Sequence, residues 1–389
     1  MDSRERLSAA LNHKEGDRVP VDFGTTNSTG ISLTAYKNYL KYLGIKREAK
    51  TGNLMQQLAI VDEDILDHIG CDTRPAAPKG YTPDIEYLGD GSKEYDDEWG
   101  IRWRMCKGGF YYDMIKNPLA GIDDLNVLSK AMKEPIPTAE RIEGIGERIS
   151  AIRKQNKAVF LKGFVPGVME FAAWLRGYEQ FFMDMYIAPE IAKAILEFSC
   201  EVKERYWRAV LKEFGDMVDV VNESDDLGMQ TGPLIAPEAY REYIKPLHRR
   251  IIDTIKKHSK AKIFLHCCGA ASAFIPDLID AGFDILNPVQ YKARGMDLKR
   301  LKQEYGKDIV FWGGGIDTQE ILPRGSKKAI EDEVKKNVEI LMKDGGFVFA
   351  QVHNIQADVP PENIQTMYDA FYKSCFFEKC PAHPIGRMQ

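Results

Sequence analysis

A histidine and a cysteine two positions apart, His266 and Cys268, are the residues of this chain whose spacing best suits metal binding. They end a short apolar run, and in extended chain residues two apart point to the same side. An imidazole and a thiolate placed in this way can bind one Zn²⁺ together, at roughly 2.0–2.3 Å. A buried histidine bonded to a backbone carbonyl, beside cysteines that act as small apolar side chains, would have the same spacing. The pair alone therefore leaves both interpretations open.

Other polar residues also follow apolar runs, and their convergence favours the metal site. We expect His353 to be the third zinc ligand, with Glu223 or water as the fourth. If Glu223 is not a ligand, burial would raise its pKa and suit it to general acid catalysis, and Asp225 is a second catalytic candidate. The candidate substrate-binding residues at the same ends are Asn222, Gln290, Gly314, Gln351 and Asn354.

The elements that must position these residues are short β-branched runs, each followed by an amphipathic segment of helical length. This alternation predicts a parallel sheet. About eight strands close a (β/α)8 barrel, whose reacting groups lie at the C-terminal strand ends. An open doubly wound sheet is the alternative, but no Gly-x-Gly-x-x-Gly turn follows the early strands. The predicted strands are Val19–Phe23, Cys71–Arg74, Ala158–Phe164, Met217–Glu223, Lys262–Cys267, Asp284–Asn287, Ile309–Gly313 and Phe347–Gln351.

One segment interrupts the alternation. Tyr81–Met114 contains alternating residues around Asp-Gly, which predicts β-hairpins inserted so as to cap one end of the barrel. Its aromatic residues, Trp99 to Trp103, are expected to pack the cap rather than bind a ligand. We expect residues 1–389 to form a single domain, and the tail Phe376–Gln389 to lie on its surface. Helices are predicted over Pro237–His258, Ser326–Lys343 and Pro360–Lys373.

The composition is that of an ordinary globular protein. The 389 residues are 44% hydrophobic and 29% charged, and the net charge of −5 does not indicate nucleic acid or an anionic membrane as a partner. The N-terminus predicts no secretory signal, and no apolar run reaches the roughly 18 residues of a membrane span. The 7 cysteines are expected to be free thiols in a reducing cytoplasm. The sequence leaves open whether the chain forms a homodimer.

Several segments together resemble the uroporphyrinogen decarboxylase superfamily. The resemblance covers nearly the whole chain and implies a (β/α)8 barrel. The segments that carry it are Asp17-Arg18-Val19-Pro20-Val21, Gly232-Pro233-Leu234-Ile235-Ala236-Pro237-Glu238, Tyr243-Ile244-Lys245-Pro246, His266-Cys267-Cys268-Gly269 and Val359-Pro360-Pro361-Glu362-Asn363-Ile364.

Two branches of that superfamily differ in the chemistry they imply. Authentic decarboxylases carry an arginine-rich segment that clamps substrate carboxylates, where this chain reads Asp22-Phe23-Gly24-Thr25-Thr26-Asn27. Without those arginines a porphyrinogen lacks its main charge partners. The cobalamin-dependent methyltransferases bind Zn²⁺ through His-x-Cys and a later cysteine. His266 and Cys268 match the first two ligands, and His353 stands at the place of the third.

That substitution affects the expected substrate. One thiolate and two imidazoles would leave zinc with a formal charge of about +1, a stronger Lewis acid than a neutral site. We therefore expect methyl transfer between a methyl ether, or a pterin, and a corrinoid protein. The chain contains no Asp-x-His-x-x-Gly motif, so the corrinoid (cobalamin) is expected on a separate partner. A decarboxylase of an altered tetrapyrrole and a non-catalytic barrel that binds the corrinoid partner are the alternatives.

Overall fold

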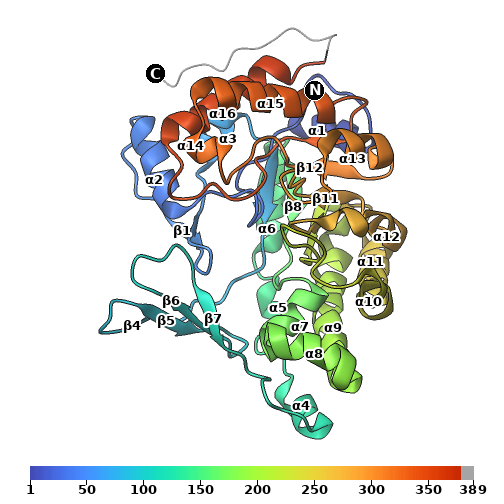
Figure 1. The fold of residues 1–389 in the computed structure, drawn as a ribbon. Helices are drawn as coiled ribbons and strands as arrows, with labels where there is room; N and C mark the ends of the chain where they lie inside the picture. Colours follow the sequence, from blue (N-terminus) through green and yellow to red (C-terminus); the bar gives the residue numbers. More distant parts are fainter. Residues whose placement is uncertain (378–389) are drawn as a thin grey trace.

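Seven parallel strands form one curled sheet in the computed structural model, which describes residues 1–377 (Figure 1). Their order is β13-β12-β11-β10-β9-β8-β3, so neighbours in the sheet follow one another along the chain. The strands are β3 (Thr73–Ala76), β8 (Ala158–Leu161), β9 (Val220–Ser224), β10 (Lys262–His266), β11 (Ile285–Asn287), β12 (Val310–Trp312) and β13 (Phe347–Val348).

The eighth predicted strand, Val19–Phe23, closes the barrel between β13 and β3. Phe349 N donates to Pro20 O at 2.8 Å, and on the other side Asp72 N donates to Val21 O at 2.9 Å. The pairing with Phe349 is parallel but limited to a single bridge. Pro20 has no N–H to donate, which limits how far a regular ladder can extend here. The predicted (β/α)8 barrel is confirmed, with seven regular strands and this one irregular segment.

The interior of the barrel is filled by apolar side chains. Alternate residues of the strands point inward, as in Phe160, Phe264 and Trp312, whose rings make edge-to-face contacts at 5.1–5.7 Å. Helix α1 (Ser3–Leu11) covers the N-terminal end with Leu7 and Leu11. The interior is therefore packed, and in a barrel of this kind the reacting groups lie at the C-terminal strand ends.

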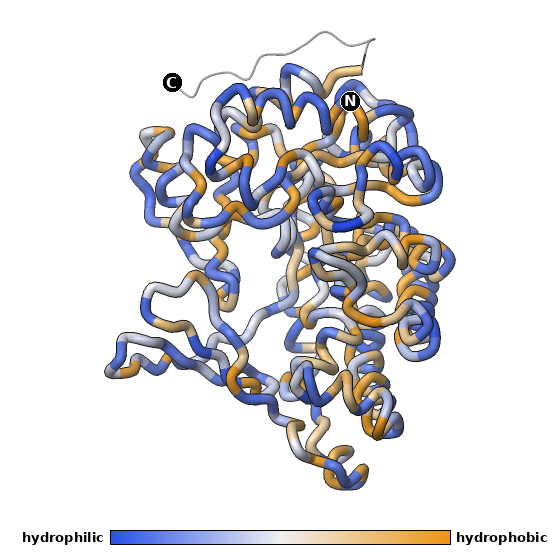
Figure 2. Tube along the Cα trace, in the orientation of Figure 1, coloured by the Kyte–Doolittle hydropathy of each residue, from blue (hydrophilic) through white to orange (hydrophobic). Residues whose placement is uncertain are grey.

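Helices surround the sheet, and hydrophobic and hydrophilic residues are interleaved along them (Figure 2). In α11 (Lys245–His258) the buried residues His248, Ile251, Ile252 and Ile255 have the spacing of one helix face. No helix within residues 1–377 is long and apolar enough to cross a membrane. The other outer helices are α2 (Leu33–Tyr42), α3 (Glu63–Ile69), α4 (Leu125–Ala131), α5 (Thr138–Arg141), α6 (Ile145–Lys154), α7 (Val168–Arg176), α8 (Tyr178–Ile187), α9 (Pro189–Phe214), α10 (Pro237–Ala239), α12 (Ile275–Ala281), α13 (Leu298–Tyr305), α14 (Ile321–Arg324), α15 (Lys327–Leu341) and α16 (Pro361–Ser374).

The three predicted helices are present, with small differences at their ends. Pro237–His258 is divided, because a π-helical turn over Tyr240–Ile244 separates α10 from α11. Ser326 caps α15, its hydroxyl accepting a bond from Ala329 N at 3.2 Å. The prediction for the tail falls mostly on residues 378–389, outside the described residues.

The predicted hairpin insertion is a four-stranded antiparallel sheet, which Figure 1 shows apart from the barrel sheet. A two-stranded sheet of β1 (Thr51–Asn53) and β2 (Leu58–Ala59) precedes it. We call the four-stranded sheet the cap; its strands are β4 (Glu86–Tyr87), β5 (Lys93–Asp96), β6 (Arg102–Met105) and β7 (Asp113–Lys116).

Candidate metal and substrate site

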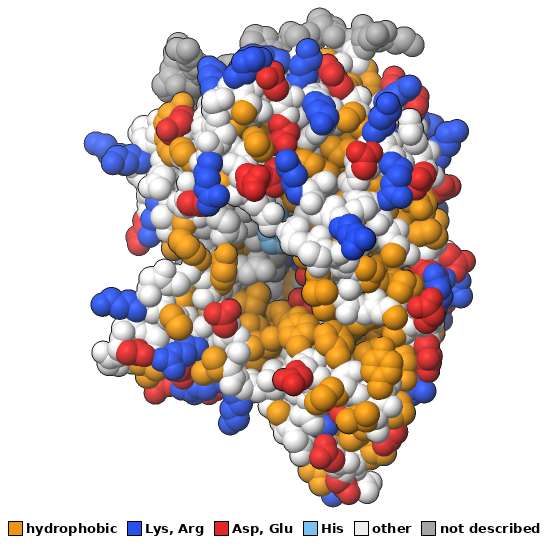
Figure 3. Space-filling view, viewed as in Figure 1, with side chains coloured by type: hydrophobic (Ala, Val, Ile, Leu, Met, Phe, Trp, Pro, Cys, Tyr) orange, Lys and Arg blue, Asp and Glu red, His pale blue; other side chains and the backbone are white. Residues whose placement is uncertain are grey.

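A cavity of about 320 Å³ lies where the strand ends of the barrel meet the cap. Figure 3 shows the hollow, with histidine deep inside it and hydrophobic side chains along its rim. This volume is at the low end of the range for small-molecule sites. The lining residues come from the ends of β8, β9 and β10, from α7, from the cap and from loops. They are Thr26, Asn27, Ser28, Asn53, Met55, Gln56, Tyr95, Asp97, Trp103, Lys162, Gly163, Phe164, Val165, Pro166, Glu170, Trp174, Asn222, Ser224, Asp226, His266 and His353.

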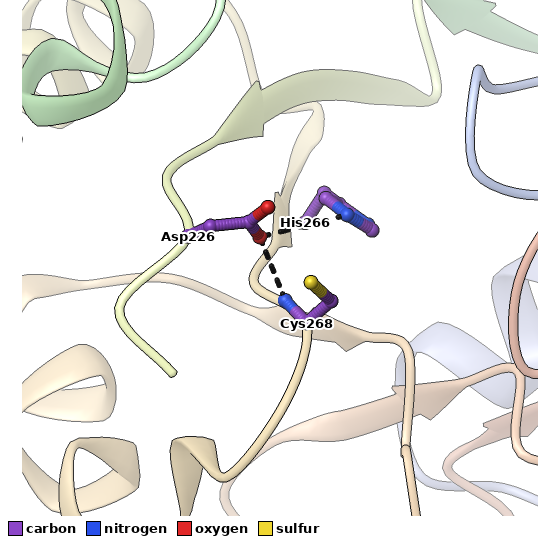
Figure 4. Close-up of side chains that lie close together, drawn as sticks. All are labelled: Asp226, His266 and Cys268. Carbon is purple, nitrogen blue, oxygen red and sulfur yellow. Dashed lines mark hydrogen bonds and ion pairs between the residues drawn. The ribbon is translucent and has the colours of Figure 1, made fainter. Parts of the chain in front are cut away.

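Three ligand-type side chains, Asp226, His266 and Cys268, converge at this end (Figure 4). One ligand atom from each lies within 4.8 Å of the other two. The pairing of β9 with β10 brings these side chains together. Ser224 is opposite His266, and Asp226 and Cys268 each follow two residues after one member of that pair. Cys268 N donates to Asp226 Oδ1 at 2.8 Å, which fixes the carboxylate beside the thiol.

The orientation of His266 is set from behind by Asn287, at the end of β11. Asn287 Nδ2 donates to Trp312 O at 2.9 Å, so Oδ1 is the atom that faces His266 Nδ1, at 2.8 Å. Ser28 Oγ donates to the same Oδ1 at 2.9 Å. His266 must therefore carry its proton on Nδ1, which leaves Nε2 free as a ligand, 3.7 Å from Asp226 Oδ1.

The arrangement fits a zinc ion. Donor atoms about 2.0–2.3 Å from a tetrahedral ion lie roughly 3.3–3.8 Å from one another. The separation of 3.7 Å between His266 Nε2 and Asp226 Oδ1 is within that range. Imidazole, thiol and carboxylate are all established types of zinc ligand. Three protein ligands leave one position of a tetrahedron open, as in catalytic rather than structural zinc sites.

The electrostatics of the site also favour a cation. Burial, then the charges of Asp226 and Asp225, raise the pKa of Glu170 well above its usual range. Burial and the neighbouring Asp226 likewise raise the pKa of the Cys268 thiol. Burial, with a smaller contribution from His266, lowers the pKa of His353 to about 4, so this imidazole is neutral at pH 7. A divalent cation would relieve the repulsion among the acidic groups.

His353 lies near the three convergent residues but is not one of them. Its ring centroid is 5.6 Å from that of His266, and it lines the cavity. The group of atoms within mutual ligand distance contains Asp226 instead. The sequence shows Asp226 only as part of an Asp-Asp pair after a strand, where a helix start or a solvated surface is equally reasonable.

Glu223 and Asp225 face away from the cavity. Strand residues alternate, and in β9 the lining residues are Asn222 and Ser224. Glu223, 2% exposed, points into the helix layer, where Lys203 Nζ lies 3.0 Å from its carboxylate and the indole of Trp207 donates to it.

Asp225, like Glu223, is held by neighbouring residues outside the cavity. It accepts bonds from Met169 N at 3.0 Å and Glu170 N at 2.9 Å, at the start of α7. His248 Nε2 lies 3.0 Å from the same carboxylate. Both carboxylates predicted to be catalytic are thus engaged by neighbours outside the cavity.

Of the five candidate substrate-binding residues, Asn222 lines the cavity and the other four do not. Gln290 Oε1 accepts from Gly269 N at 2.8 Å, which holds the turn after Cys268. Gln351 Nε2 donates to Gly30 O at 3.2 Å, and Asn354 Oδ1 accepts from Gly30 N at 3.1 Å. Gly314 has a φ of +87°, so glycine suits its turn, and its carbonyl accepts from Asn337.

The part of the cavity built by the cap was not among the site residues predicted from the sequence. Trp99 packs as predicted, with its ring 4.8 Å from that of Phe171. Trp103, by contrast, lines the cavity together with Tyr95 and Trp174. These contacts join segments far apart in the chain, and no local pattern signals them.

Comparison with known proteins gives two groups of relatives. The chain is similar to the methylcobamide:CoM methyltransferase MtbA of Methanosarcina acetivorans, 22% identical over 94% of this chain and 96% of that protein. It is also similar to the uroporphyrinogen decarboxylase of Geotalea uraniireducens, 24% identical over 49% of this chain and 51% of that protein. Among solved structures, a methyltransferase from Methanosarcina mazei shares the fold, with a TM-score of 0.65 and 20% identity over 96% of this chain and 99% of that one. The sequence profile of uroporphyrinogen decarboxylase (URO-D) matches residues 100–374, and the chain belongs to that family.

Proposed function

We propose that this protein is a zinc-dependent methyltransferase that moves a methyl group between a small methyl ether and a corrinoid carried by a separate protein. The observation that carries the proposal is the convergence of Asp226, His266 and Cys268 beside a cavity of about 320 Å³. A cavity of that size suits a small substrate, whereas a corrinoid is far too large to be enclosed and must approach at the mouth. The full-length similarity to a methylcobamide:CoM methyltransferase supports the same assignment.

The cavity does not suit the decarboxylase alternative. A uroporphyrinogen carries eight carboxylates and needs several cationic partners. Within the described chain the cavity lining contains one lysine and no arginine, together with the acids Asp97, Glu170 and Asp226. This composition would repel such a substrate. The relatives named uroporphyrinogen decarboxylase therefore support the fold more than the reaction.

The donor set changes the expected charge of the site. With Asp226 in place of His353, one thiolate and one carboxylate balance Zn²⁺, so the formal charge of about +1 expected from the sequence no longer applies. A preference for oxygen persists on other grounds, because a carboxylate is a harder donor than the second thiolate that the resemblance implies. When bound, zinc supplies Lewis acidity toward the oxygen of the substrate.

The residues of the chain supply positioning and proton transfer. Asn287 holds the His266 ring with Nε2 toward the cavity. Glu170, not Glu223, lines the cavity, and its raised pKa favours the protonated carboxyl. A protonated carboxyl at this position can donate to the leaving oxygen of an ether. The cap covers the cavity with Tyr95 and Trp103, which limits the access of water.

The test combines metal analysis with turnover. Purified protein should contain one zinc per chain and should methylate free cob(I)alamin from methyl ethers, followed by absorbance. Cys268→Ala should lose both properties, whereas Cys267→Ala, the matched control, should keep them because Cys267 is buried away from the cavity. Methyl transfer by zinc-free Cys268→Ala, or efficient production of coproporphyrinogen by the wild type, would contradict the proposal. Rapid demethylation of methylcobalamin by a simple thiol would contradict the assignment of a methyl ether as the small substrate.

A further inference from the structure

One cation that faces the cavity has no anionic partner among residues 1–377. Lys162 follows β8, and its ammonium donates to Asn27 Oδ1 at 2.6 Å. Among residues 1–377 no carboxylate lies within ion-pair distance of this half-buried ammonium, whereas a fully buried cation such as Lys203 is paired, with Glu223 at 3.0 Å. A cation lining a small cavity and bonded only to a neutral amide is suited to bind an anion supplied by a ligand.

The cavity that this cation lines also has an aromatic wall. Trp103 and Trp174 meet edge to face at 5.1 Å, and Tyr95 is stacked on Trp103 at 6.5 Å with an interplanar angle of 21°. All three line the cavity, as does Phe164, which is two residues beyond Lys162. Such a wall favours a flat apolar body over a chain of polar groups.

The strand order sets the separation between the cation and the metal ligands. Leu161 of β8 pairs with Val221 of β9, so Lys162 is level with Asn222. His266 of β10 is opposite Ser224 of β9, two residues further along. Two strand intervals of about 4.8 Å and two residues of about 3.3 Å along the strand place the backbones of Lys162 and His266 roughly 11–12 Å apart. Within the described lining, Lys162 is the one lysine or arginine side chain, so an anionic group of a ligand is expected to pair there rather than beside the carboxylate of Asp226.

We propose that the substrate is an aromatic methyl ether with a carboxylate on the ring, such as a methoxybenzoate. Its carboxylate pairs with Lys162, its ring lies along Tyr95, Trp103 and Trp174, and its ether oxygen faces His266 and Cys268. This assignment rests on the proposed function. In the reaction the O–CH₃ bond breaks, and Co(I) of the partner corrinoid supplies the electron pair that forms the new Co–CH₃ bond. The oxygen keeps the electrons of the broken bond and takes a proton, leaving as a hydroxybenzoate.

Binding to the zinc-loaded protein tests the assignment without turnover. Calorimetry would compare 4-methoxybenzoate with its neutral counterpart 4-methoxybenzyl alcohol. The wild type should bind the carboxylate about tenfold to a hundredfold more tightly, the range expected for a charge-assisted hydrogen bond. Lys162→Met should bind both compounds equally, Lys162→Arg should retain part of the preference, and Lys154→Met, an exposed lysine on α6, should match the wild type. Circular dichroism and Tm identify a variant that fails to fold, and in that case Lys162→Gln replaces it.

Two results would overturn the inference. One is equal affinity of the wild type for the carboxylate and the alcohol, and the other is an unchanged preference in Lys162→Met. Tighter binding of 4-methoxybenzenesulfonate than of the benzoate would overturn the choice of carboxylate. These experiments distinguish a failure of the substrate assignment from a failure of the proposed function. Carboxylate binding through Lys162 without methyl transfer would contradict the function alone, and methyl transfer from neutral ethers with no carboxylate preference would contradict this inference alone.

Discussion

Replacing Asn287 with alanine should weaken zinc binding although Asn287 is not a ligand. Its Oδ1 accepts from His266 Nδ1 at 2.8 Å, and the amide is itself fixed by Trp312 O at 2.9 Å. Alanine removes the acceptor that selects the His266 tautomer and holds the ring, so Nε2 is no longer presented to the ion. The loss of such an orienting partner typically weakens metal affinity about 10–100-fold, or about 1.4–2.7 kcal/mol.

The assay is competition for zinc with a chromophoric chelator at fixed pH and ionic strength. Asn337→Ala is the matched control, because Asn337 is also a buried asparagine whose amide donates to a backbone carbonyl, that of Gly314, at 3.1 Å. Both variants should lose some stability, but only Asn287→Ala should lose zinc affinity. Wild-type affinity in a folded Asn287→Ala protein, or an equal loss in Asn337→Ala, would show that Asn287 does not orient His266 for zinc.

The remaining predictions concern four side chains. Asp226→Ala should lower zinc affinity by about tenfold or more in the same competition assay, whereas His353→Ala should keep its zinc and instead change substrate affinity. Glu223→Gln should retain zinc but unfold at a lower denaturant concentration, since breaking a buried ion pair costs about 3–5 kcal/mol. An unchanged unfolding midpoint would contradict a structural role for the pair of Glu223 with Lys203. Burial lowers the pKa of Lys162 to about 8, opposed by the charge of Asp22. Below that pH the ammonium is protonated, so affinity for methoxybenzoate should be constant and then fall about tenfold per pH unit above it, while affinity for the neutral alcohol stays flat in the same titrations.

The barrel could be predicted because its strands are apolar runs separated by helices. The metal ligands could be predicted at one strand end, that of β10. His266 and Cys268 are two residues apart, so whichever way one points the other follows. The same rule could not place Glu223. Residues of β9 are buried on both faces, so the sequence Val220-Val221 has no polar alternation to show which face is inward. A shift of one residue along the strand exchanges the inward and outward faces. Glu223 lies on the outward face, against the helix layer.

The rest of the site depends on contacts that no local pattern encodes. Asp226 lies beyond the end of its strand, and only the pairing of Ser224 with His266 brings it to Cys268. Lys162 has no carboxylate partner within the described part of the chain, and only a structure can show this. Trp103 reaches the cavity because the cap folds over the strand ends. Register and long-range packing, rather than residue type, decide these positions.

X-ray absorption at the zinc edge of the purified protein, with zinc content measured on the same sample, would establish which side chains bind the metal. We expect one zinc per chain with a single sulfur ligand at about 2.3 Å and the remaining nitrogen and oxygen ligands at about 2.0–2.2 Å. In Cys268→Ala the sulfur contribution should vanish, and in His353→Ala the spectrum should be unchanged. Wild-type protein without zinc, a zinc site without sulfur, or a spectrum altered by the His353 substitution but not by Asp226→Ala would contradict the site as assigned.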